Sequence, residues 1–371
     1  MHNKKKLLIF HPTIAPYRID FFNDLSQAFN TRICLRYKNL RSQTFDYEKI
    51  IKKFRFTPIY LKEAFKIGKR TFPKGIWKHL DEFSPEIVIV EEFSYGTILV
   101  LFHRFIKKRK YKIVSICDDS YNMVAENNDF SLAHKLLRRF VTPKLDSILL
   151  VELKVREWYI QNYNKGFYFP IIKSEESTRQ EYERLLPLSK ETIDKYKLSN
   201  KNVFLFVGRL VAIKNVETAI RAFSKLNQQE NTFIIIGDGP ERSKLEQLSK
   251  ELSTNILFLG RLEGDFLNIW YNIANIFILP SILEPFGAVT NEALLAGCYA
   301  IVSNKAGSSC LIKNDINGCL FNPQNIEELS EKMKSLSKLT KSTSSNILRP
   351  NKMLLRYQDK MNELITHLEN L

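Results

Sequence analysis

The sequence has little cysteine and no metal-binding cysteine pattern. Its 371 residues include five cysteines, with no CxxC pair and no histidine at ligand spacing. An odd, scattered set argues against a zinc site and is typical of proteins from reducing compartments. We therefore expect free thiols and a cytoplasmic location. The cysteines stand at positions 34, 117, 298, 310 and 319.

Long apolar runs are also missing. No stretch approaches the roughly 18 apolar residues that a membrane-spanning helix needs. The best candidate, Thr97–Phe105, is interrupted by His103 and Arg104. The Leu7–Phe10 run follows three lysines but is closed by Pro12, which favours a first β-strand over a signal peptide.

Acidic residues are scarce in the first half only. The net charge is +16; residues 1–170 carry 31 Lys and Arg against 17 Asp and Glu, whereas residues 171–371 carry 25 against 23. Such a field attracts phosphate, as in nucleic acid, anionic lipid or a phosphorylated acceptor, although a solubilising surface is the alternative. The basic clusters are Lys49–Arg55, Lys66–Lys74 and Lys107–Lys112.

Short apolar runs alternate with segments of helical spacing, and the alternation restarts after a polar connection. This pattern predicts two α/β domains, each with a parallel sheet covered by helices. We expect domains at 1–170 and 171–350, with 351–371 as a C-terminal helix that could pack on the first domain. Residues 171–200 are interpreted as a connection with one helix, and Ser335–Asn346 as a loop. The predicted strands include Leu7–Phe10, Thr31–Tyr37, Ile87–Val90, Ile113–Cys117, Ile148–Val151, Val203–Val207, Thr232–Ile236, Ile256–Leu259, Ile276–Leu279 and Ala300–Ser303.

Glycines and cations follow the strands of the second half. Gly208 ends one predicted strand and is followed by Arg209 and, before the next helix, Lys214. Ligands bind at the carboxyl edge of open parallel sheets, so two cations there suit a diphosphate. Gly237 begins a second strand-end turn, GDGP. Each piece alone could be an ordinary turn or surface charge.

Two carboxylates follow in the segment EPFGAVTNE. Glu284 and Glu292 can accept hydrogen bonds from sugar hydroxyls, Glu292 from the ribose and Glu284 from the transferred sugar. The loop amides around Phe286 and Gly287 can point at the diphosphate. Glu292 could instead be a charge that stabilises the start of a helix.

The motifs FVGRL, GDGP, FLGR and EPFGAVTNE, over residues 203–322, resemble the donor-binding domain of the retaining family 4 glycosyltransferases. The opening PYR resembles members that assemble bacterial surface polysaccharides. The resemblance implies the GT-B fold, with two Rossmann-like domains whose sheets face each other across a cleft. It also implies donor contacts from Gly208, Arg209, Lys214, Gly237, Gly260, Arg261, Leu262, Glu284, Pro285, Phe286, Gly287 and Glu292. Many relatives carry an acid near Ser309 or Cys310, and this sequence does not.

The first half matches less closely. Arg18 could reach the donor phosphate or be a surface charge. Asp118 stands where many relatives have a histidine and could contact the donor sugar, or the pair with Asp119 could cap the next helix. His11, at another strand end, is the reserve candidate, and His103 is interpreted as structural.

The resemblance implies a retaining transfer of sugar from a nucleoside diphosphate sugar to a polysaccharide or lipid-linked oligosaccharide. Glu284, Asp118, Arg209 and Lys214 are the predicted catalytic residues. No acidic cluster suggests a metal, so we expect neither metal nor cofactor. The first domain could contact the anionic inner face of the plasma membrane. The alternatives are an epimerase or phosphorylase on the same scaffold, or a nucleic-acid-binding protein, for which no recognition motif is present.

Overall fold

The chain folds into two compact units, each built on a parallel β-sheet. The computed structural model describes residues 4–39, 46–67, 70–125, 131–340 and 347–371. The first unit comprises Met1–Lys173 and Tyr357–Leu371, and the second comprises Ser174–Arg356. Residues 341–346, part of a predicted loop, and 68–69, within a basic cluster, lie outside the described residues.

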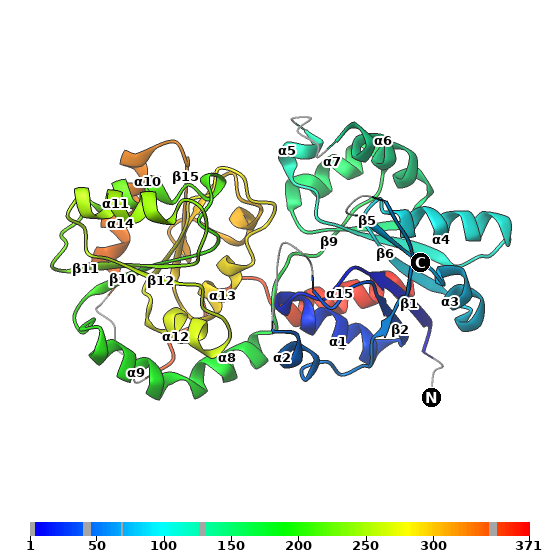
Figure 1. The fold of residues 1–371 in the computed structure, drawn as a ribbon, viewed down its shortest axis with the longest axis horizontal. Helices are drawn as coiled ribbons and strands as arrows, with labels where there is room; N and C mark the ends of the chain where they lie inside the picture. The colour runs from blue at the N-terminus through cyan, green and yellow to red at the C-terminus, as the bar shows by residue number, and fades with distance from the viewer. Residues whose placement is uncertain (1–3, 40–45, 68–69, 126–130, 341–346) are drawn as a thin grey trace. The chain divides into compact units, whose positions relative to one another are not determined.

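The first unit has a seven-stranded sheet in the order β3-β2-β1-β6-β7-β8-β9 (Figure 1). Its strands are β1 Lys6–His11, β2 Asn30–Leu35, β3 Ile59–Tyr60, β6 Ile87–Glu91, β7 Lys112–Cys117, β8 Ser147–Leu150 and β9 Phe167–Tyr168, beside the hairpin of β4 Glu63–Ile67 and β5 Arg70–Pro73. Its helices are η1 Pro16–Arg18, α1 Ile19–Ala28, α2 Tyr47–Ile51, α3 Ile76–Phe83, α4 Tyr95–Ile106, α5 Tyr121–Val124, α6 Leu132–Val141, η2 Thr142–Lys144, α7 Leu153–Tyr163 and α15 Tyr357–Glu369.

Alternate strand residues form separate cores on the two faces of this sheet. On one face, Leu8, Val88 and Ile113 pack with residues of α3, α4, α6 and α7. Side chains point to opposite faces at successive positions of a strand, so their neighbours Leu7 and Ile87 lie on the other face. All of these strand residues are fully or almost fully buried, which explains why the strands are continuous apolar runs.

The last helix returns to the first unit. Figure 1 shows α15 beside α1, and the two helices are in contact. Met361, Leu364 and Leu368 are fully buried there. His367 lies 2.7 Å from the Ser147 hydroxyl through Nε2, and its ring stacks on Phe167. The C-terminal segment is therefore part of the first unit's core.

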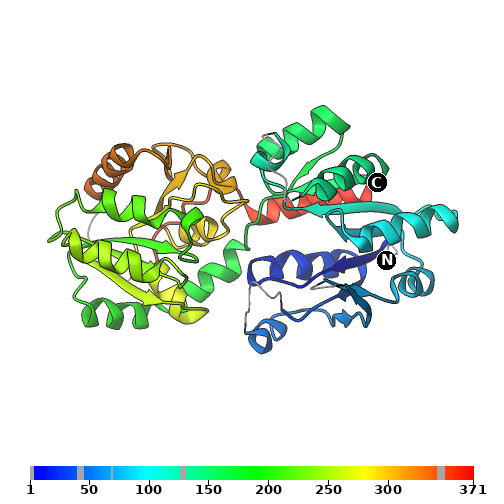
Figure 2. The same cartoon turned by 45° about the horizontal axis from the view of Figure 1, so that its top comes forward.

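The second unit has a six-stranded sheet in the order β12-β11-β10-β13-β14-β15, with every neighbouring pair parallel. Helices α10, α11 and α14 lie on one side, and α8, α9, α12 and α13 on the other (Figures 1 and 2). Its strands are β10 Asn202–Val207, β11 Asn231–Ile236, β12 Ile256–Gly260, β13 Ile276–Leu279, β14 Tyr299–Ser303 and β15 Gly318–Phe321. Its helices are α8 Glu175–Arg184, α9 Leu186–Lys195, η3 Ala212–Lys214, α10 Val216–Phe223, α11 Arg242–Glu251, α12 Asp265–Ile273, α13 Val289–Leu295, η4 Gly307–Leu311 and α14 Ile326–Leu339.

The predicted parallel α/β architecture and strands are confirmed, and two local predictions are wrong. Residues 171–200 hold two helices instead of one, because α8 buries only Thr178 and Tyr182 and gives a weak apolar pattern. The predicted loop at Ser335 belongs to α14, where Leu336 packs in the core. In α14, Leu329, Met333 and Leu336 are buried at about one residue per turn, so the segment is helical although its composition is polar.

The carboxyl ends of three neighbouring strands are joined by backbone contacts. The Gly208 N–H donates to the Ile236 carbonyl at 3.0 Å, and the Gly237 N–H donates to the Gly260 carbonyl at 2.8 Å. Gly237 has φ +146°, and a Cβ there would lie 1.8 Å from the Gly208 carbonyl oxygen. Only glycine allows this approach.

We expect Gly237→Ala to destabilise the protein by about 3 kcal/mol or more, since the added methyl must push two strand ends apart. Gly75→Ala is the matched control: Gly75 also has positive φ, +90°, and lies in the left-handed region, but a Cβ there meets nothing within 4 Å. The control should lose only about 1 to 2 kcal/mol, the cost of the left-handed backbone. Urea unfolding of both variants measures the difference, and equal losses would contradict the proposed clash.

Candidate functional site

The loops that carry the predicted donor residues meet at one edge of the second unit's sheet. Gly208, Gly237 and Gly260 lie at the ends of β10, β11 and β12, and Glu284 follows β13, which pairs with β10. All of these strands are parallel, so their carboxyl ends share one edge. This is where ligands bind in open parallel sheets.

Lys214 and Glu284 form a direct ion pair between two of these loops. The Lys214 ammonium donates to Glu284 Oε2, and the Ser281 hydroxyl lies 3.4 Å from the same oxygen. Both charged side chains are largely buried, with 16% and 11% of their surfaces exposed. Seventy positions of sequence separate them, so the fold alone brings them together.

Asn215 fixes the lysine's loop. It has φ +54°, and its side-chain amide donates to the carbonyls of Pro280 and Pro323 at 3.2 and 2.8 Å. The η3 turn that carries Lys214 is thereby tied to the segment after β13, which includes Glu284. The position of the ammonium is therefore set before any ligand binds.

Arg209 is the more accessible cation at this edge. Its side chain is exposed, and within the described part of the chain it has no ion-pair partner. Arg261, which begins the loop after β12, is paired with Glu263 through an Nε contact of 2.8 Å. Leu262 between them is half-buried. Arg209 is thus the cation that an incoming anion meets without first displacing a carboxylate.

The loop from Glu284 to Gly287 is held against the start of η4. The Gly307 N–H donates to the Glu284 carbonyl and the Ser308 N–H to the Phe286 carbonyl, at 3.0 and 2.6 Å. A Cβ on Gly307 would lie 2.1 Å from the Pro285 carbonyl oxygen. Within the described residues, the N–H groups of Phe286 and Gly287 have no hydrogen-bond acceptor. Backbone N–H groups of this kind can bind an anion.

Glu292 is held by two buried tyrosines. The Tyr271 hydroxyl donates to Glu292 Oε2 at 3.0 Å, and the Tyr182 hydroxyl donates to the Glu292 carbonyl at the same distance. Burial, followed by the charge of Glu292, raises the pKa of Tyr271 well above its usual value, so the phenol stays a hydrogen-bond donor. Glu292 lies in the first turn of α13, as the alternative interpretation also expects.

The first unit gathers its own predicted residues at the carboxyl edge of its sheet. Arg18, from η1, is buried and pairs with Asp118 at 2.5 Å, while 44% of the Asp118 side chain is exposed. The His11 ring donates from Nδ1 to the Thr13 carbonyl at 2.6 Å, which leaves Nε2 as an acceptor. Burial, with a contribution from Arg18, lowers the pKa of His11 to about 3. His11 is therefore neutral at physiological pH.

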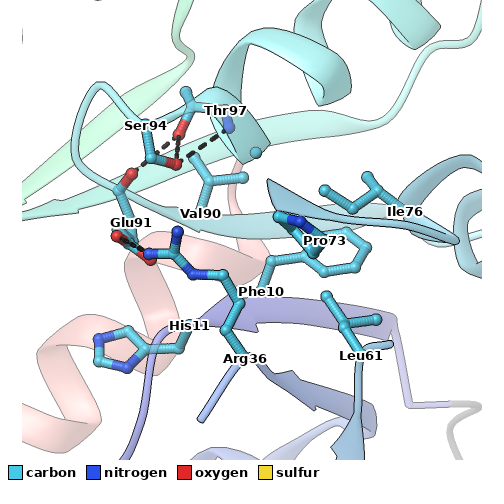
Figure 3. Close-up of a pocket in the computed structure, with 11 residues that line it drawn as sticks. Phe10, His11, Arg36, Leu61, Pro73, Ile76, Val90, Glu91, Ser94 and Thr97 are labelled. Carbon is cyan, nitrogen blue, oxygen red and sulfur yellow. Dashed lines mark hydrogen bonds and ion pairs between the residues drawn. The ribbon is translucent and has the colours of Figure 1, made fainter. Parts of the chain in front are cut away.

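A small pocket lies beside this cluster (Figure 3). Arg36 and Glu91 form an ion pair across it, and His11 lines the same pocket. Ser94 and Thr97, at the start of α4, are hydrogen-bonded to each other at 3.2 Å. The pocket has a volume of only about 10 Å³, which is room for a single water, so it holds no sugar in this conformation.

Asp119 and His103 are structural. Asp119 is buried, accepts from the Tyr159 hydroxyl at 2.6 Å and lies 3.2 Å from Arg138 Nε. It does not cap α5, whose N-cap residue is Ser120, so that alternative for the acidic pair is wrong. His103 is buried between the Tyr111 hydroxyl and Asp81, as predicted.

Three further charged residues lie at this edge that the sequence analysis did not identify as site residues. Glu91 ends β6, Glu92 follows it, and Arg36 follows β2. The rule that charged residues after a parallel strand gather at one edge would have found them. Tyr271 was also missed, and no sequence signal marks it, because it reaches Glu292 from α12. In the part of the chain that the structure describes, no group of three or more His, Cys, Asp or Glu side chains could hold a metal.

Comparison with known proteins agrees with this geometry. Residues 189–349 match the family model of the group 1 glycosyl transferases. Most of the second unit is therefore similar to this family of glycosyltransferase domains. A stretch of 134 residues is 37% identical to an uncharacterized glycosyltransferase of Methanocaldococcus jannaschii, covering 35% of this chain and 34% of that protein.

A second relative is the Escherichia coli UDP-Gal:alpha-D-GlcNAc-diphosphoundecaprenol alpha-1,3-galactosyltransferase. It is 31% identical over 159 residues, which cover 41% of this chain and 40% of that protein. The chain thus aligns with about a third to two-fifths of the length of these curated relatives.

Solved structures match over the full length. HepE of Anabaena, in complex with UDP, superimposes with a TM-score of 0.76 at 15% identity, covering 99% of this chain and 100% of HepE. Sucrose-phosphate synthase of Thermosynechococcus elongatus gives a TM-score of 0.70 at 14% identity, with 99% of each chain covered. The chain has the GT-B fold.

The buried Glu92 carboxyl should make stability depend on pH. Burial first, then Asp118 and Asp119, raises the pKa of Glu92 from 4.5 to about 8. The folded state therefore binds a proton that the unfolded state has released between these values, so stability is lost as pH rises through this range. Glu92→Gln should be more stable than the wild type near pH 8, by on the order of 1 kcal/mol or more, and the gain should shrink toward about pH 5.

Thermal unfolding at the two pH values measures this effect. Glu157→Gln, at an exposed position of α7, is the control and should give no pH-dependent gain. Because His11 is neutral in the folded protein, it destabilises the protein as pH falls below about 6.5, which is the opposite direction. This effect is the same in the wild type and both variants. A gain of equal size at both pH values would contradict the assignment to Glu92.

Proposed function

We propose that the protein is a retaining glycosyltransferase that takes its sugar from a nucleoside diphosphate sugar. The observation that carries this proposal is the Lys214–Glu284 pair, which joins two donor motifs at the carboxyl edge of the second unit. The match of this unit to the group 1 glycosyl transferases supports it. HepE was solved with UDP, and we take UDP as the first nucleotide to test.

The second unit would bind the donor through the residues predicted from the sequence. Arg209 and Lys214 would bind the diphosphate, with the amides of Phe286 and Gly287 beside them. Glu292, fixed by Tyr271, would accept hydrogen bonds from the ribose, and the backbone of residues 260–262 would contact the base. Gly208 and Gly237 would let the diphosphate approach the strand ends closely.

The chemistry would depend on charge that develops on the leaving group. The bond between the anomeric carbon and the diphosphate oxygen breaks, the acceptor hydroxyl oxygen bonds to that carbon on the same face, and the hydroxyl proton passes to the departing diphosphate oxygen. Negative charge grows on the diphosphate as its bond breaks. Arg209 and Lys214 would stabilise it more in the transition state than in the ground state. Glu284 would orient both the ammonium and the transferred sugar.

The first unit would supply acceptor contacts and Asp118. At the carboxyl edge of its sheet, the Arg36–Glu91 pair would contact acceptor hydroxyls. Asp118, oriented by Arg18, would take the catalytic role that many relatives give to a histidine, with His11 as the alternative. The Escherichia coli relative is named for a diphosphoundecaprenol-linked substrate, which supports a lipid-linked oligosaccharide or polysaccharide acceptor.

Donor binding should depend on Lys214 and Glu292. We expect UDP, GDP or ADP to bind the wild type, and Lys214→Ala to weaken that binding by about ten- to a hundredfold, because a charge-assisted contact contributes about 1.5 to 3 kcal/mol. Glu292→Ala should have a similar effect, and Tyr271→Phe a smaller one. Isothermal titration calorimetry measures each constant.

Lys225→Ala is the matched control for the lysine. Lys225 also pairs with a glutamate of the second unit, Glu327, but lies outside the edge of the sheet that carries the motifs. Its nucleotide affinity should equal that of the wild type. Absence of binding by any nucleotide, or equal affinities in all variants, would contradict the donor site.

The reaction should need no divalent metal, because two cations face the diphosphate. With an α-linked donor, proton NMR of the product should show an α linkage, and EDTA should leave the rate unchanged. Loss of activity in EDTA that Mg²⁺ or Mn²⁺ restores would contradict the metal-independent mechanism. A β-linked product would contradict retention.

A further inference from the structure

Helix α4 carries an exposed apolar stripe. Ile98, Phe102, Phe105 and Ile106 are exposed, and Phe105 keeps 81% of its surface. Their spacing of three and four residues places them on one side of the helix. Val100 and His103, on the other side, are fully buried in the first unit.

Helix α6 carries a second stripe of the same kind. Leu132, Leu136 and Phe140 recur at every fourth position and are 81%, 58% and 67% exposed. Arg138 and Val141 are buried on the opposite side. Apolar side chains of this size on the water side of a helix are unusual and indicate a partner.

The two stripes belong to one side of the first unit. Val100 of α4 and Val141 of α6 pack in the same core on one face of the sheet. Arg104 of α4 donates to the Lys144 carbonyl and pairs with Asp146, both at 2.5 Å, which ties the end of α4 to the segment after α6. We call this surface the α4–α6 face, formed by Ile98, Phe102, Phe105, Ile106, Leu132, Leu136 and Phe140. Figure 1 labels the two helices that carry it.

Cations outnumber acids around this face, although Arg104 and Lys112 pair with Asp146, Arg109 pairs with Asp81, and the buried Arg138 lies against Asp119. Residues 93–117 and 130–145 contain no aspartate or glutamate. The Lys144 ammonium lies 5.5 Å from the centre of the Phe140 ring, so charge and apolar surface are adjacent. The other cations in these stretches are Lys107, Lys108, Lys110, Lys135, Arg139 and Lys144.

We propose that the α4–α6 face docks on the surface of an anionic lipid bilayer. Helices with apolar residues on one side and lysine and arginine beside them lie in the membrane interface, and anionic headgroups attract the cations. Leucine, isoleucine and phenylalanine at the most exposed positions suit acyl chains, whereas a nucleic acid would need stacking platforms in a basic groove. Across the described residues, no helix is long and apolar enough to span a bilayer, so the contact is peripheral.

Vesicle co-sedimentation of the full chain tests this proposal. The wild type should sediment with vesicles of phosphatidylcholine and phosphatidylglycerol and remain in solution with phosphatidylcholine alone. Leu136→Gln/Phe140→Gln should weaken binding by about tenfold per side chain. Lys107→Gln/Lys108→Gln should weaken it by roughly fivefold per charge, with less dependence on salt than in the wild type.

Phe266→Gln is the matched control, since Phe266 lies on the second unit and is 72% exposed. It should bind vesicles like the wild type. Thermal unfolding and UDP affinity should stay unchanged in all variants, which separates this proposal from that of the donor site. Absence of binding to anionic vesicles, wild-type binding by the Leu136/Phe140 variant, or equal loss in the control would overturn it, as would binding to an oligonucleotide in preference to vesicles.

Discussion

The close backbone contact between the ends of β10, β11 and β12 positions the candidate donor site. Gly208, Gly237 and Gly260 have no side chains, so the backbone at the strand ends comes close enough to form hydrogen bonds between neighbouring strands. At this edge the Arg209 side chain is exposed to solvent, whereas the Lys214 side chain is largely buried and paired with Glu284. A side chain at Gly237 would push the end of β11 away from the end of β10.

The two units differ in the electrostatics of their sheet edges. The second unit combines an accessible arginine with a lysine already oriented by a carboxylate, which suits a ligand with two phosphates. The first unit instead concentrates acids: Glu91, Glu92 and Asp118 lie at the ends of neighbouring strands, and only Glu91 and Asp118 have arginine partners in ion pairs that the structure describes. Burial, followed by repulsion from Asp118 and Asp119, raises the pKa of Glu92 to about 8 and keeps a proton on it near neutral pH.

The excess positive charge of the first half is divided between the sheet edge and the surface of two helices. Part of it is neutralised at the sheet edge, where Arg18 and Arg36 pair with acids. Another part borders the exposed apolar residues of α4 and α6, in stretches without acidic residues. Apolar exposure and an excess of positive charge coincide there, and a solubilising surface would have no need for Phe105 or Leu132.

The sequence by itself determined the strand–helix alternation, because doubly covered parallel strands must be apolar runs, and the order of the donor motifs, because strand ends mark the binding edge. Only the tertiary structure decided that Lys214 meets Glu284, that Tyr271 holds Glu292, and that Asp119 is a buried structural acid. Those contacts join residues distant in sequence, and no local periodicity encodes them. The exposed sides of α4 and α6 also needed the structure, because an apolar residue in a helix is ordinarily buried, and only packing shows which side remains in water.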